Sequence, residues 1–363
     1  MNGFFRSSVL RFVLFAASLP LRGCSPGDAP VEMVSVRIPL PSAPPQAGPA
    51  SHVILISIDG LRPDAITTAP APNLLALLRR GTHCPEAETG IPSVTLPSHA
   101  SMLTGLRPSR HGMTENEDSG RIIPHPTILS MAGAAGLSTA MLFAKDKFHS
   151  LVHAGTVHWV YGPRRSQRTS AGRAPASSED AVPAEGTDER TPGRSPPPSP
   201  APVAREEVFT GPRIASGTEI AKVFSAEWSR QAYHLTFIHL GDPDAAGHRS
   251  GWMSDEYLQA VREADRAIGM IVASVEASPQ GRTTAIIVTS DHGGKGKSHF
   301  QADHPRDPEC LTVPWICAGP GTAAGRTIER TVHVEDTAPT VLALLGLAIP
   351  DSLDGHRVEE VLR

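Results

Sequence analysis

The chain alternates short apolar runs with longer amphipathic stretches. The apolar runs are rich in β-branched residues and predict buried strands at 52–58, 139–144, 234–240, 284–289 and 313–318. Helical periodicity and capping residues predict helices between them, at 72–80, 128–135, 217–230, 254–276 and 336–345. Strands that alternate with helices predict an α/β fold, in which a mostly parallel central sheet carries helices on both faces.

Two stretches lack this pattern. Residues 25–50 are rich in Pro and Ala and predict a tether. Residues 162–206 are rich in Pro, Ser, Arg and Ala, without an apolar run, and predict a disordered low-complexity insertion. The rest of residues 51–363 then forms one folded domain.

The first 24 residues predict an export signal. Arg6 and Arg11 flank the start of an apolar run at 12–19, which is too short to span a bilayer. The run leads to Leu21-Arg22-Gly23-Cys24, which is similar to a bacterial lipoprotein cleavage box except at Arg22. We therefore expect a periplasmic or cell-surface protein with a possible lipid anchor at Cys24. An unstructured N-terminus without an export role is the alternative.

Composition narrows the possible partners. The net charge is −4 and no basic run occurs, which argues against a nucleic-acid-binding surface. Four cysteines without a Cys-x-x-Cys pair predict neither a disulfide scaffold nor a thiolate metal site.

Acidic and imidazole side chains follow several of the predicted strands. Because the carboxyl ends of parallel strands meet at one edge of a sheet, we expect these side chains to lie together. Oxygen and nitrogen ligands without thiolate suit zinc or a similar divalent ion, and seven candidates are enough for two ions. The candidates are Asp59, Asp244, His248, Asp291, His292, His299 and His304.

Three further features carry candidate chemistry. Thr95 lies in a loop between Pro92 and Pro97, before a predicted helix at 98–103 whose N-terminus favours an anion. Asn116 follows a polar turn, and Lys145 and Lys147 follow the strand at 139–144. Taken alone, Thr95 and Asn116 are also typical turn residues, and the lysines also fit a solvated charge cluster.

Six motifs together resemble the alkaline phosphatase superfamily and, within it, the type I phosphodiesterase/nucleotide pyrophosphatase branch. They are ISIDGLRPD, IPSVTLPSHASMLTG, HGMTEN, DPDAAGH, SDHGG and DTAPTVLALLG, and the resemblance covers residues 51–363 outside the insertion. It implies a three-layer sandwich that forms a catalytic domain with two divalent metal ions, most commonly Zn²⁺. One ion is expected on Asp59, Thr95, Asp291 and His292. The other is expected on Asp244, His248 and a later histidine, for which His299 fits better than His304.

The resemblance also implies an activity. Thr95 is expected to be the nucleophile that forms a phospho-threonine intermediate, and Asn116 to donate to the phosphoryl oxygens. The substrate is expected to be a small-molecule phosphodiester or a nucleotide or pyrophosphate ester. Phosphomonoesterase activity is an alternative. A second alternative is phosphonoacetate hydrolase activity, because Lys145 and Lys147 resemble the substrate-binding lysines of that enzyme. A third, from another class, is a metal-binding lipoprotein without turnover. A sulfatase would need Cys or Ser at the position of Thr95.

Overall fold

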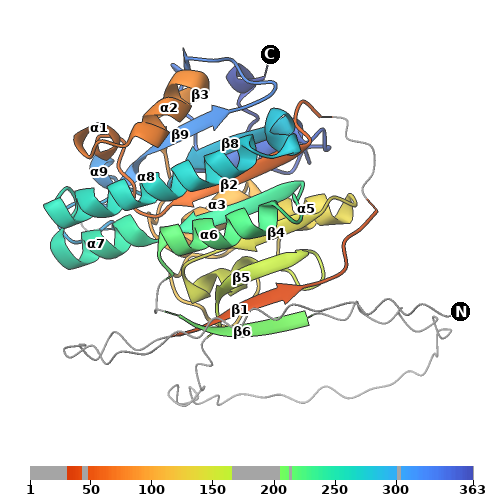
Figure 1. The fold of residues 1–363 in the computed structure, drawn as a ribbon. Helices are drawn as coiled ribbons and strands as arrows, with labels where there is room; N and C mark the ends of the chain where they lie inside the picture. Colours follow the sequence, from red (N-terminus) through yellow and green to blue (C-terminus); the bar gives the residue numbers. More distant parts are fainter. Residues whose placement is uncertain (1–30, 43–47, 166–204, 212–214, 301–303, 363) are drawn as a thin grey trace, which may run out of the picture.

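One large β-sheet organises the molecule. The structure is a computed structural model that describes residues 31–42, 48–165, 205–211, 215–300 and 304–362. Within these residues the strands are β1 (Val31–Arg37), β2 (His52–Ile58), β3 (Thr82–Glu88), β4 (Thr139–Leu142), β5 (Trp159–Pro163), β6 (Arg205–Gly211), β7 (Leu235–Leu240), β8 (Thr284–Thr289), β9 (Thr312–Ala318) and β10 (Arg326–Thr327). Their order across the sheet is β10-β3-β9-β8-β2-β7-β4-β5-β1-β6 (Figure 1).

The centre of the sheet is parallel, and antiparallel pairs flank it on both sides, with β10 added parallel to β3 at one edge. Strands β8, β2, β7, β4 and β5 form one parallel block. Strand β9 runs antiparallel to β8 and β3, and β1 runs antiparallel to β5 and β6. The prediction of a mostly parallel sheet is therefore confirmed.

Helices cover both faces of the sheet. They are α1 (Ala65–Thr68), α2 (Pro72–Arg80), α3 (Thr95–Thr104), α4 (Pro108–His111), α5 (Ile128–Ala134), α6 (Gly217–Trp228), α7 (Asp242–Ser250), α8 (Asp255–Glu276), α9 (Pro308–Leu311) and α10 (Thr337–Leu344). Helices α2, α6 and α7 pack with α8 on one face, and α3, α5 and α10 pack together on the other. The predicted layers of helix on both sides of the sheet are thus present.

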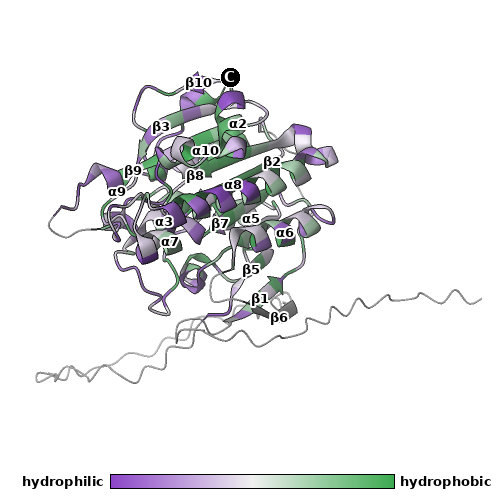
Figure 2. Ribbon diagram, turned by 60° about the vertical axis from the view of Figure 1, so that its left-hand side comes forward, coloured by the Kyte–Doolittle hydropathy of each residue, from purple (hydrophilic) through white to green (hydrophobic). Residues whose placement is uncertain are grey.

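The hydrophobic core consists of two clusters, one on each face of the sheet. Side chains of β2 alternate between the two faces, as a strand requires. Leu55 belongs to the apolar cluster that includes Leu103 of α3, whereas Ile54 and Ile56 belong to the cluster that includes Ile268 of α8. Figure 2 shows the result, with hydrophobic strands in the middle layer and polar surfaces on the outer sides of the helices. None of the described helices is both long and apolar enough to cross a membrane.

The predicted tether was wrong for part of its length. Residues Val31–Arg37 form β1, which hydrogen-bonds to β5 on one side and β6 on the other. Met33, Val34 and Ser35 are buried there. Prolines and alanines on both sides of this strand conceal it in the sequence.

The predicted insertion was also too long at both ends. Residues 162–163 belong to β5 and residues 205–206 to β6. Residues 1–30 and 166–204 lie outside the described residues. The export signal, lipidation at Cys24 and disorder within the insertion therefore stay predictions.

Candidate active site

The carboxyl ends of three neighbouring strands position the acidic side chains. Asp59 follows β2, Asp291 and His292 follow β8, and α7 begins at Asp242, two residues after β7 ends. Asp59, Asp291 and His292 are completely buried. Gly60 turns the chain with a positive φ of 73°, and a Cβ there would lie 3.0 Å from the Cα of Asp244. A side chain at position 60 would therefore separate the two acidic segments.

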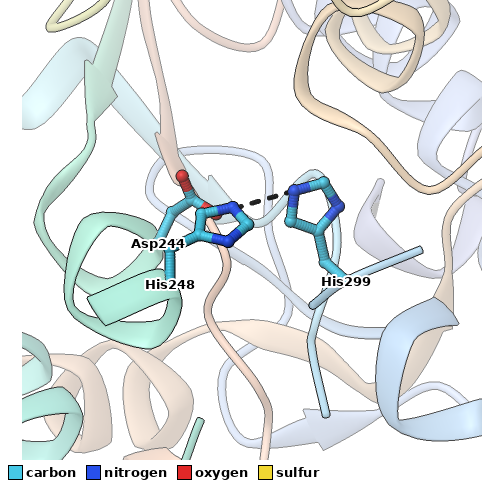
Figure 3. A group of neighbouring side chains, drawn as sticks. All are labelled: Asp244, His248 and His299. Carbon is cyan, nitrogen blue, oxygen red and sulfur yellow. Dashed lines mark ion pairs between the residues drawn. The ribbon is translucent and has the colours of Figure 1, made fainter. Parts of the chain in front are cut away.

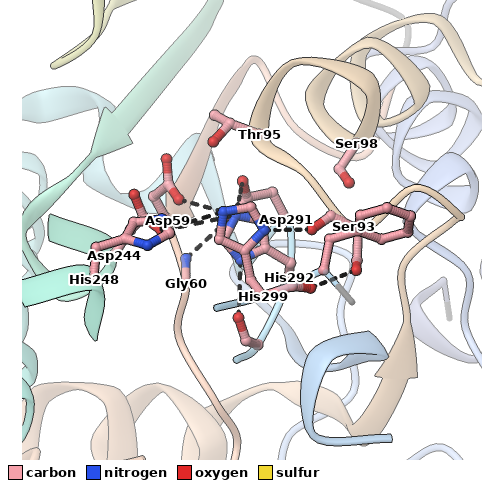
Figure 4. A network of polar contacts seen from close by, with 12 residues as sticks. Asp59, Gly60, Ser93, Thr95, Ser98, Asp244, His248, Asp291, His292 and His299 are labelled. Carbon is pink, nitrogen blue, oxygen red and sulfur yellow. Dashed lines mark hydrogen bonds and ion pairs between the residues drawn. The ribbon is translucent and has the colours of Figure 1, made fainter. Parts of the chain in front are cut away.

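Two groups of side chains are geometrically able to bind a metal ion. Asp59, Asp291 and His292 form one group, and Asp244, His248 and His299 form the other. Within each group, the possible ligand atoms all lie within 4.8 Å of one another. Figure 3 shows the His248 ring next to the Asp244 carboxylate and the His299 ring facing them, and Figure 4 shows the side chains of both groups in one cluster. The structure thus brings together six of the predicted ligands from three segments of the chain.

Each of the three carboxylates has one oxygen bound to a protein donor and one without a partner. Asp59 Oδ2 accepts from His239 and Lys145, Asp244 Oδ2 accepts from Lys145, and Asp291 Oδ1 accepts from the Gly60 N–H. The opposite oxygens are among the buried atoms of the described residues that have no hydrogen-bond partner, as is His292 Nε2. Unpaired buried polar atoms are costly, so their concentration at one point requires an explanation.

The orientation of three histidine rings explains these unpaired atoms. The Nδ1–H of His292 donates to the Gly293 carbonyl, that of His248 to the Lys297 carbonyl and that of His299 to the Ser93 carbonyl. In the neutral form of each ring, Nε2 therefore has a free lone pair. The three Nε2 atoms lie 3.3–3.9 Å from a carboxylate oxygen of Asp59 or Asp244. Lone pairs that face carboxylates at these distances repel unless a cation lies between them. A backbone carbonyl that fixes the tautomer is also typical of metal-binding histidines, so these residues fit divalent ions.

The electrostatics of the site agree with this geometry. Burial raises the pKa of Asp59, but the Lys145 ammonium and the hydrogen bond from His239 outweigh it and hold that pKa well below its usual value. Burial and the neighbouring charge of Asp59 raise the pKa of Asp291 well above its usual value. Burial, with the neighbouring imidazole of His292, lowers the pKa of His299 to about 3. His299 is therefore a neutral imidazole, the form that binds metals, over the whole physiological range.

Thr95 lies at the start of helix α3, above this cluster. It is the first residue of the helix, three residues earlier than predicted, and is almost fully buried. Figure 4 shows its side chain above Asp59 and the two histidine-containing groups. The positive end of the helix dipole favours an anionic group at this point.

Lys145 contacts both acidic segments and the hydroxyl. Its ammonium lies 2.5 Å from Asp59 Oδ2, 2.7 Å from Asp244 Oδ2 and 3.4 Å from Thr95 Oγ1. Burial lowers the pKa of this ammonium, but the charges of Asp59 and Asp244 outweigh burial and raise it. Lys145 is therefore a fixed positive charge. It contacts the Oδ2 atoms and leaves both Oδ1 atoms free.

Asn116 contacts the residue that follows Thr95, and Lys147 contacts Asn116. Asn116 Oδ1 accepts from the Leu96 N–H at 3.0 Å and from the Lys147 ammonium at 3.0 Å. Since both donors contact the oxygen, the amide nitrogen of Asn116 remains available as a donor. Burial, followed by the charge of Lys145, lowers the pKa of Lys147. His304, the alternative ligand, is exposed and belongs to neither metal-binding group.

Residues 53–307 match the model of the type I phosphodiesterase/nucleotide pyrophosphatase family. The chain belongs to this family. The predicted membership, within the alkaline phosphatase superfamily, is thereby confirmed. Solved structures of similar fold include murine ectonucleotide pyrophosphatase/phosphodiesterase 5 in an inactive form with AMP, at a TM-score of 0.60, 13% identity and coverage of 86% of this chain and 100% of that one. A 2-O GAG sulfatase has a TM-score of 0.59 and 15% identity, with coverage of 86% and 74%.

Several curated proteins are similar in sequence. Mouse ectonucleotide pyrophosphatase/phosphodiesterase family member 1 is 25% identical over 246 residues, which cover 66% of this chain and 24% of the mouse protein. The bis(5'-adenosyl)-triphosphatase of Xenopus laevis is 24% identical over 248 residues, which cover 66% and 46%. An uncharacterized pyrophosphatase/phosphodiesterase of Schizosaccharomyces pombe is 26% identical over 247 residues, which cover 67% and 44%. The chain thus spans 24% to 46% of the length of these relatives.

Two histidines of this family member were missed by the sequence interpretation. His239 of β7 contacts Asp59, and His99 of α3 contacts the Thr95 carbonyl and Ser57. Both are completely buried. The signal was present, because an imidazole inside a buried apolar strand or helix needs a polar partner. The sequence alone did not show which partner that was.

Proposed function

We propose that this protein is a metal-dependent phosphoric ester hydrolase that acts on phosphodiesters or on nucleotide or pyrophosphate esters. One observation carries the proposal: four buried ligand atoms without hydrogen-bond partners converge below a hydroxyl at a helix N-terminus. Family membership supports the class of reaction. One ion would be held by Asp59, Asp291, His292 and Thr95, and the other by Asp244, His248 and His299. Zn²⁺ suits this set of oxygen and imidazole ligands.

The proposed reaction has two displacements. The Thr95 oxygen attacks phosphorus and loses its proton, while the bond from phosphorus to the leaving oxygen breaks. The leaving oxygen takes up a proton and departs as the alcohol. Water then attacks the phospho-threonine, so that the remaining phosphate leaves and the Thr95 hydroxyl forms again. Two divalent ions would supply positive charge for the attacking and leaving oxygens.

The residues of the chain orient the phosphoryl group. The helix α3 N-terminus contributes the positive end of its dipole. The Asn116 amide nitrogen can donate to a phosphoryl oxygen because its carbonyl oxygen is held by Leu96 and Lys147. Lys145, 3.4 Å from Thr95 Oγ1, favours the deprotonated form of that hydroxyl. Burial keeps these charges in a region of low dielectric constant, where they act more strongly than in water.

The two lysines favour a second candidate, hydrolysis of a substrate with another anionic group, such as phosphonoacetate. Lys145 and Lys147 both reach the Thr95–Asn116 region. A substrate carboxylate beside them would replace part of the negative charge that Lys145 now contacts. Comparison of kcat/KM for phosphonoacetate, phosphate monoesters and diesters, and nucleotides separates this candidate from the first.

Replacement of the nucleophile tests the proposed function. In the Thr95→Ala variant we expect hydrolysis of a nitrophenyl phosphodiester to fall by several orders of magnitude while the protein keeps its bound zinc. Thr95→Ser, which keeps the hydroxyl, serves as the matched control and should retain part of the activity. Undiminished hydrolysis by Thr95→Ala would refute the role of Thr95. If both variants lose turnover but keep their metal, the result supports the proposed metal site and does not support the proposed nucleophile.

We also propose export of the protein to the periplasm or cell surface, with Cys24 as a possible point of lipid attachment. The apolar run at 12–19 and the following Cys24 support this proposal. The intact mass of the mature protein tests it, because processing before Cys24 removes a defined segment and acylation adds a defined mass.

A further inference from the structure

An imidazole that the proposed reaction does not use lies directly beside a proposed metal ligand. His239 belongs to β7, is completely buried, and packs its ring against Phe148 at 4.3 Å between ring centroids. Its Nδ1 lies 3.2 Å from the Ala144 backbone nitrogen. That N–H can only donate, so Nδ1 is the acceptor and the ring proton is on Nε2. His239 Nε2 therefore donates to Asp59 Oδ2, at 2.9 Å.

This hydrogen bond settles which oxygen of Asp59 remains free. Oδ2 accepts from His239 on one side and from Lys145 on the other. Oδ1 has no hydrogen-bond partner and lies 3.3 Å from His292 Nε2. With one oxygen held at a fixed place, the carboxylate cannot rotate about its last bond without breaking a buried hydrogen bond.

We propose that His239 is a positioning residue, which holds Asp59 so that Oδ1 alone faces the ion shared with Asp291 and His292. The inference rests on the metal site of the proposed function. Burial makes this hydrogen bond important, because a buried imidazole requires partners for both ring nitrogens and the partner of Nε2 is Asp59. His239 also joins Asp59 to the segment that carries Lys145, because Ala144 directly precedes that lysine.

Two substitutions separate this role from a merely structural one. In His239→Gln the side-chain amide reaches about as far as Nε2 and can still donate to Asp59. In His239→Asn the shorter amide can still accept from the Ala144 N–H but cannot reach Asp59. His234→Asn is the matched control, because it makes the same substitution just before the other end of β7, where the imidazole bonds to Ser138 instead.

Zinc affinity of the metal-free protein, measured by competition with a chromogenic chelator, is the deciding readout. We expect His239→Asn to bind zinc about 10–100-fold more weakly than the wild-type protein, as for loss of a group that orients a metal ligand. We expect His239→Gln and His234→Asn to remain within about threefold of the wild-type affinity. The loss in kcat/KM at limiting zinc should follow the same order and should shrink at saturating zinc.

Other results would overturn the proposal. Wild-type affinity in His239→Asn shows that the Asp59 hydrogen bond does not matter, and an equal loss in a folded His239→Gln shows that donation to Asp59 is not the reason. Far-ultraviolet circular dichroism establishes folding of both variants. A wild-type protein that binds no zinc overturns this inference and the proposed function together. Zinc binding that follows the expected order, without any ester hydrolysis, leaves the inference standing and removes the proposed activity.

Discussion

Replacement of Lys145 by Met removes the positive charge that joins the two acidic segments. The side chain of Lys145 is only 13% exposed, and its ammonium contacts Asp59 and Asp244 at 2.5 and 2.7 Å. Met has a similar length and keeps the apolar packing, so the substitution changes mainly the charge. Without the ammonium, two adjacent buried carboxylates lose their shared donor.

The magnitude follows from these contacts. At an effective dielectric constant of about 20, each contact corresponds to roughly 6 kcal/mol of attraction, most of which is offset by the cost of burying the charges. Breaking a buried ion pair on one side typically costs about 3–5 kcal/mol. For the roughly 280 residues that the structure describes, an unfolding entropy of about 2.1 cal/mol/K per residue converts this into a decrease in Tm of about 5–8 °C.

The assay compares the variant with and without metal. We expect metal-free Lys145→Met to unfold about 5–8 °C below the wild-type protein in differential scanning calorimetry. Zinc should then raise its Tm by more than it raises the wild-type Tm. Two divalent cations would neutralise the carboxylates that the lysine no longer contacts, and the repulsion between the ammonium and the ions is also absent. Binding to the folded state adds stability in proportion to the logarithm of the affinity.

A matched control makes the result interpretable. Lys147 contacts the neutral Asn116 oxygen, so Lys147→Met should change the metal-free Tm by no more than about 2 °C. A metal-free Lys145→Met protein as stable as the wild type would refute the assignment of Lys145 as the partner of these carboxylates. If zinc raises the Tm of Lys145→Met and of the wild-type protein by the same amount, Lys145 and the zinc ions do not interact with the same carboxylates.

Two further predictions concern the phosphoryl donor and the acid stability of the fold. Asn116→Ala should lower kcat/KM for phosphate esters by about 10²–10³-fold with zinc affinity unchanged, because it removes a donor aimed at the phosphoryl group. His234→Gln should reduce the loss of stability at acid pH. Burial, with the nearby imidazoles of His52 and His158, lowers the pKa of His234 to about 4. The unfolded chain, with a pKa near 6.5, then binds more protons between pH 4 and 6.5. This contribution to stability is complete above pH 6.5 and is lost as the pH falls toward 4.

Both predictions have outcomes that contradict them. If Asn116→Ala changes zinc affinity as much as kcat/KM, Asn116 supports the metal site instead of the phosphoryl group. For His234→Gln, the slope of Tm against pH between 4 and 6.5 is decisive, whatever the offset at pH 8. Because His234 is only about half buried, the expected difference across this window is at most about 1–2 kcal/mol after allowance for solvent screening. An unchanged slope would show that His234 does not titrate with folding.

The sequence predicted the side chains that follow strongly patterned strands. β8 has the predicted bounds, and Asp59 and Asp291 follow runs with clear apolar character, so their placement at one edge of the sheet followed from parallel pairing. No helix was predicted for the segment with Asp244 and His248. It forms helix α7, in which the spacing of four residues brings both side chains to one face.

Other contacts of the site depend on the order of the strands in the sheet, which the hydrophobic pattern of the sequence does not reveal. The contact of Lys145 with Asp59 exists because only β7 separates β4 from β2. The same arrangement places His239 between Ala144 and Asp59, where the sequence showed only one more position in a buried strand. β1 was missed for a similar reason, since its partners β5 and β6 are more than a hundred residues away.

β1 also fixes the distance between the end of β5 and the start of β6. β5 ends at Pro163, opposite Met33, and β6 begins at Arg205, opposite Arg37. These points are separated by roughly 17 Å, which about five extended residues can cross. Closing a longer connection costs only about 0.6 kcal/mol for each doubling of its length. The segment between them can therefore lengthen or shorten during evolution at little energetic cost, while the edge of the sheet that holds Asp59 and Asp291 keeps its shape.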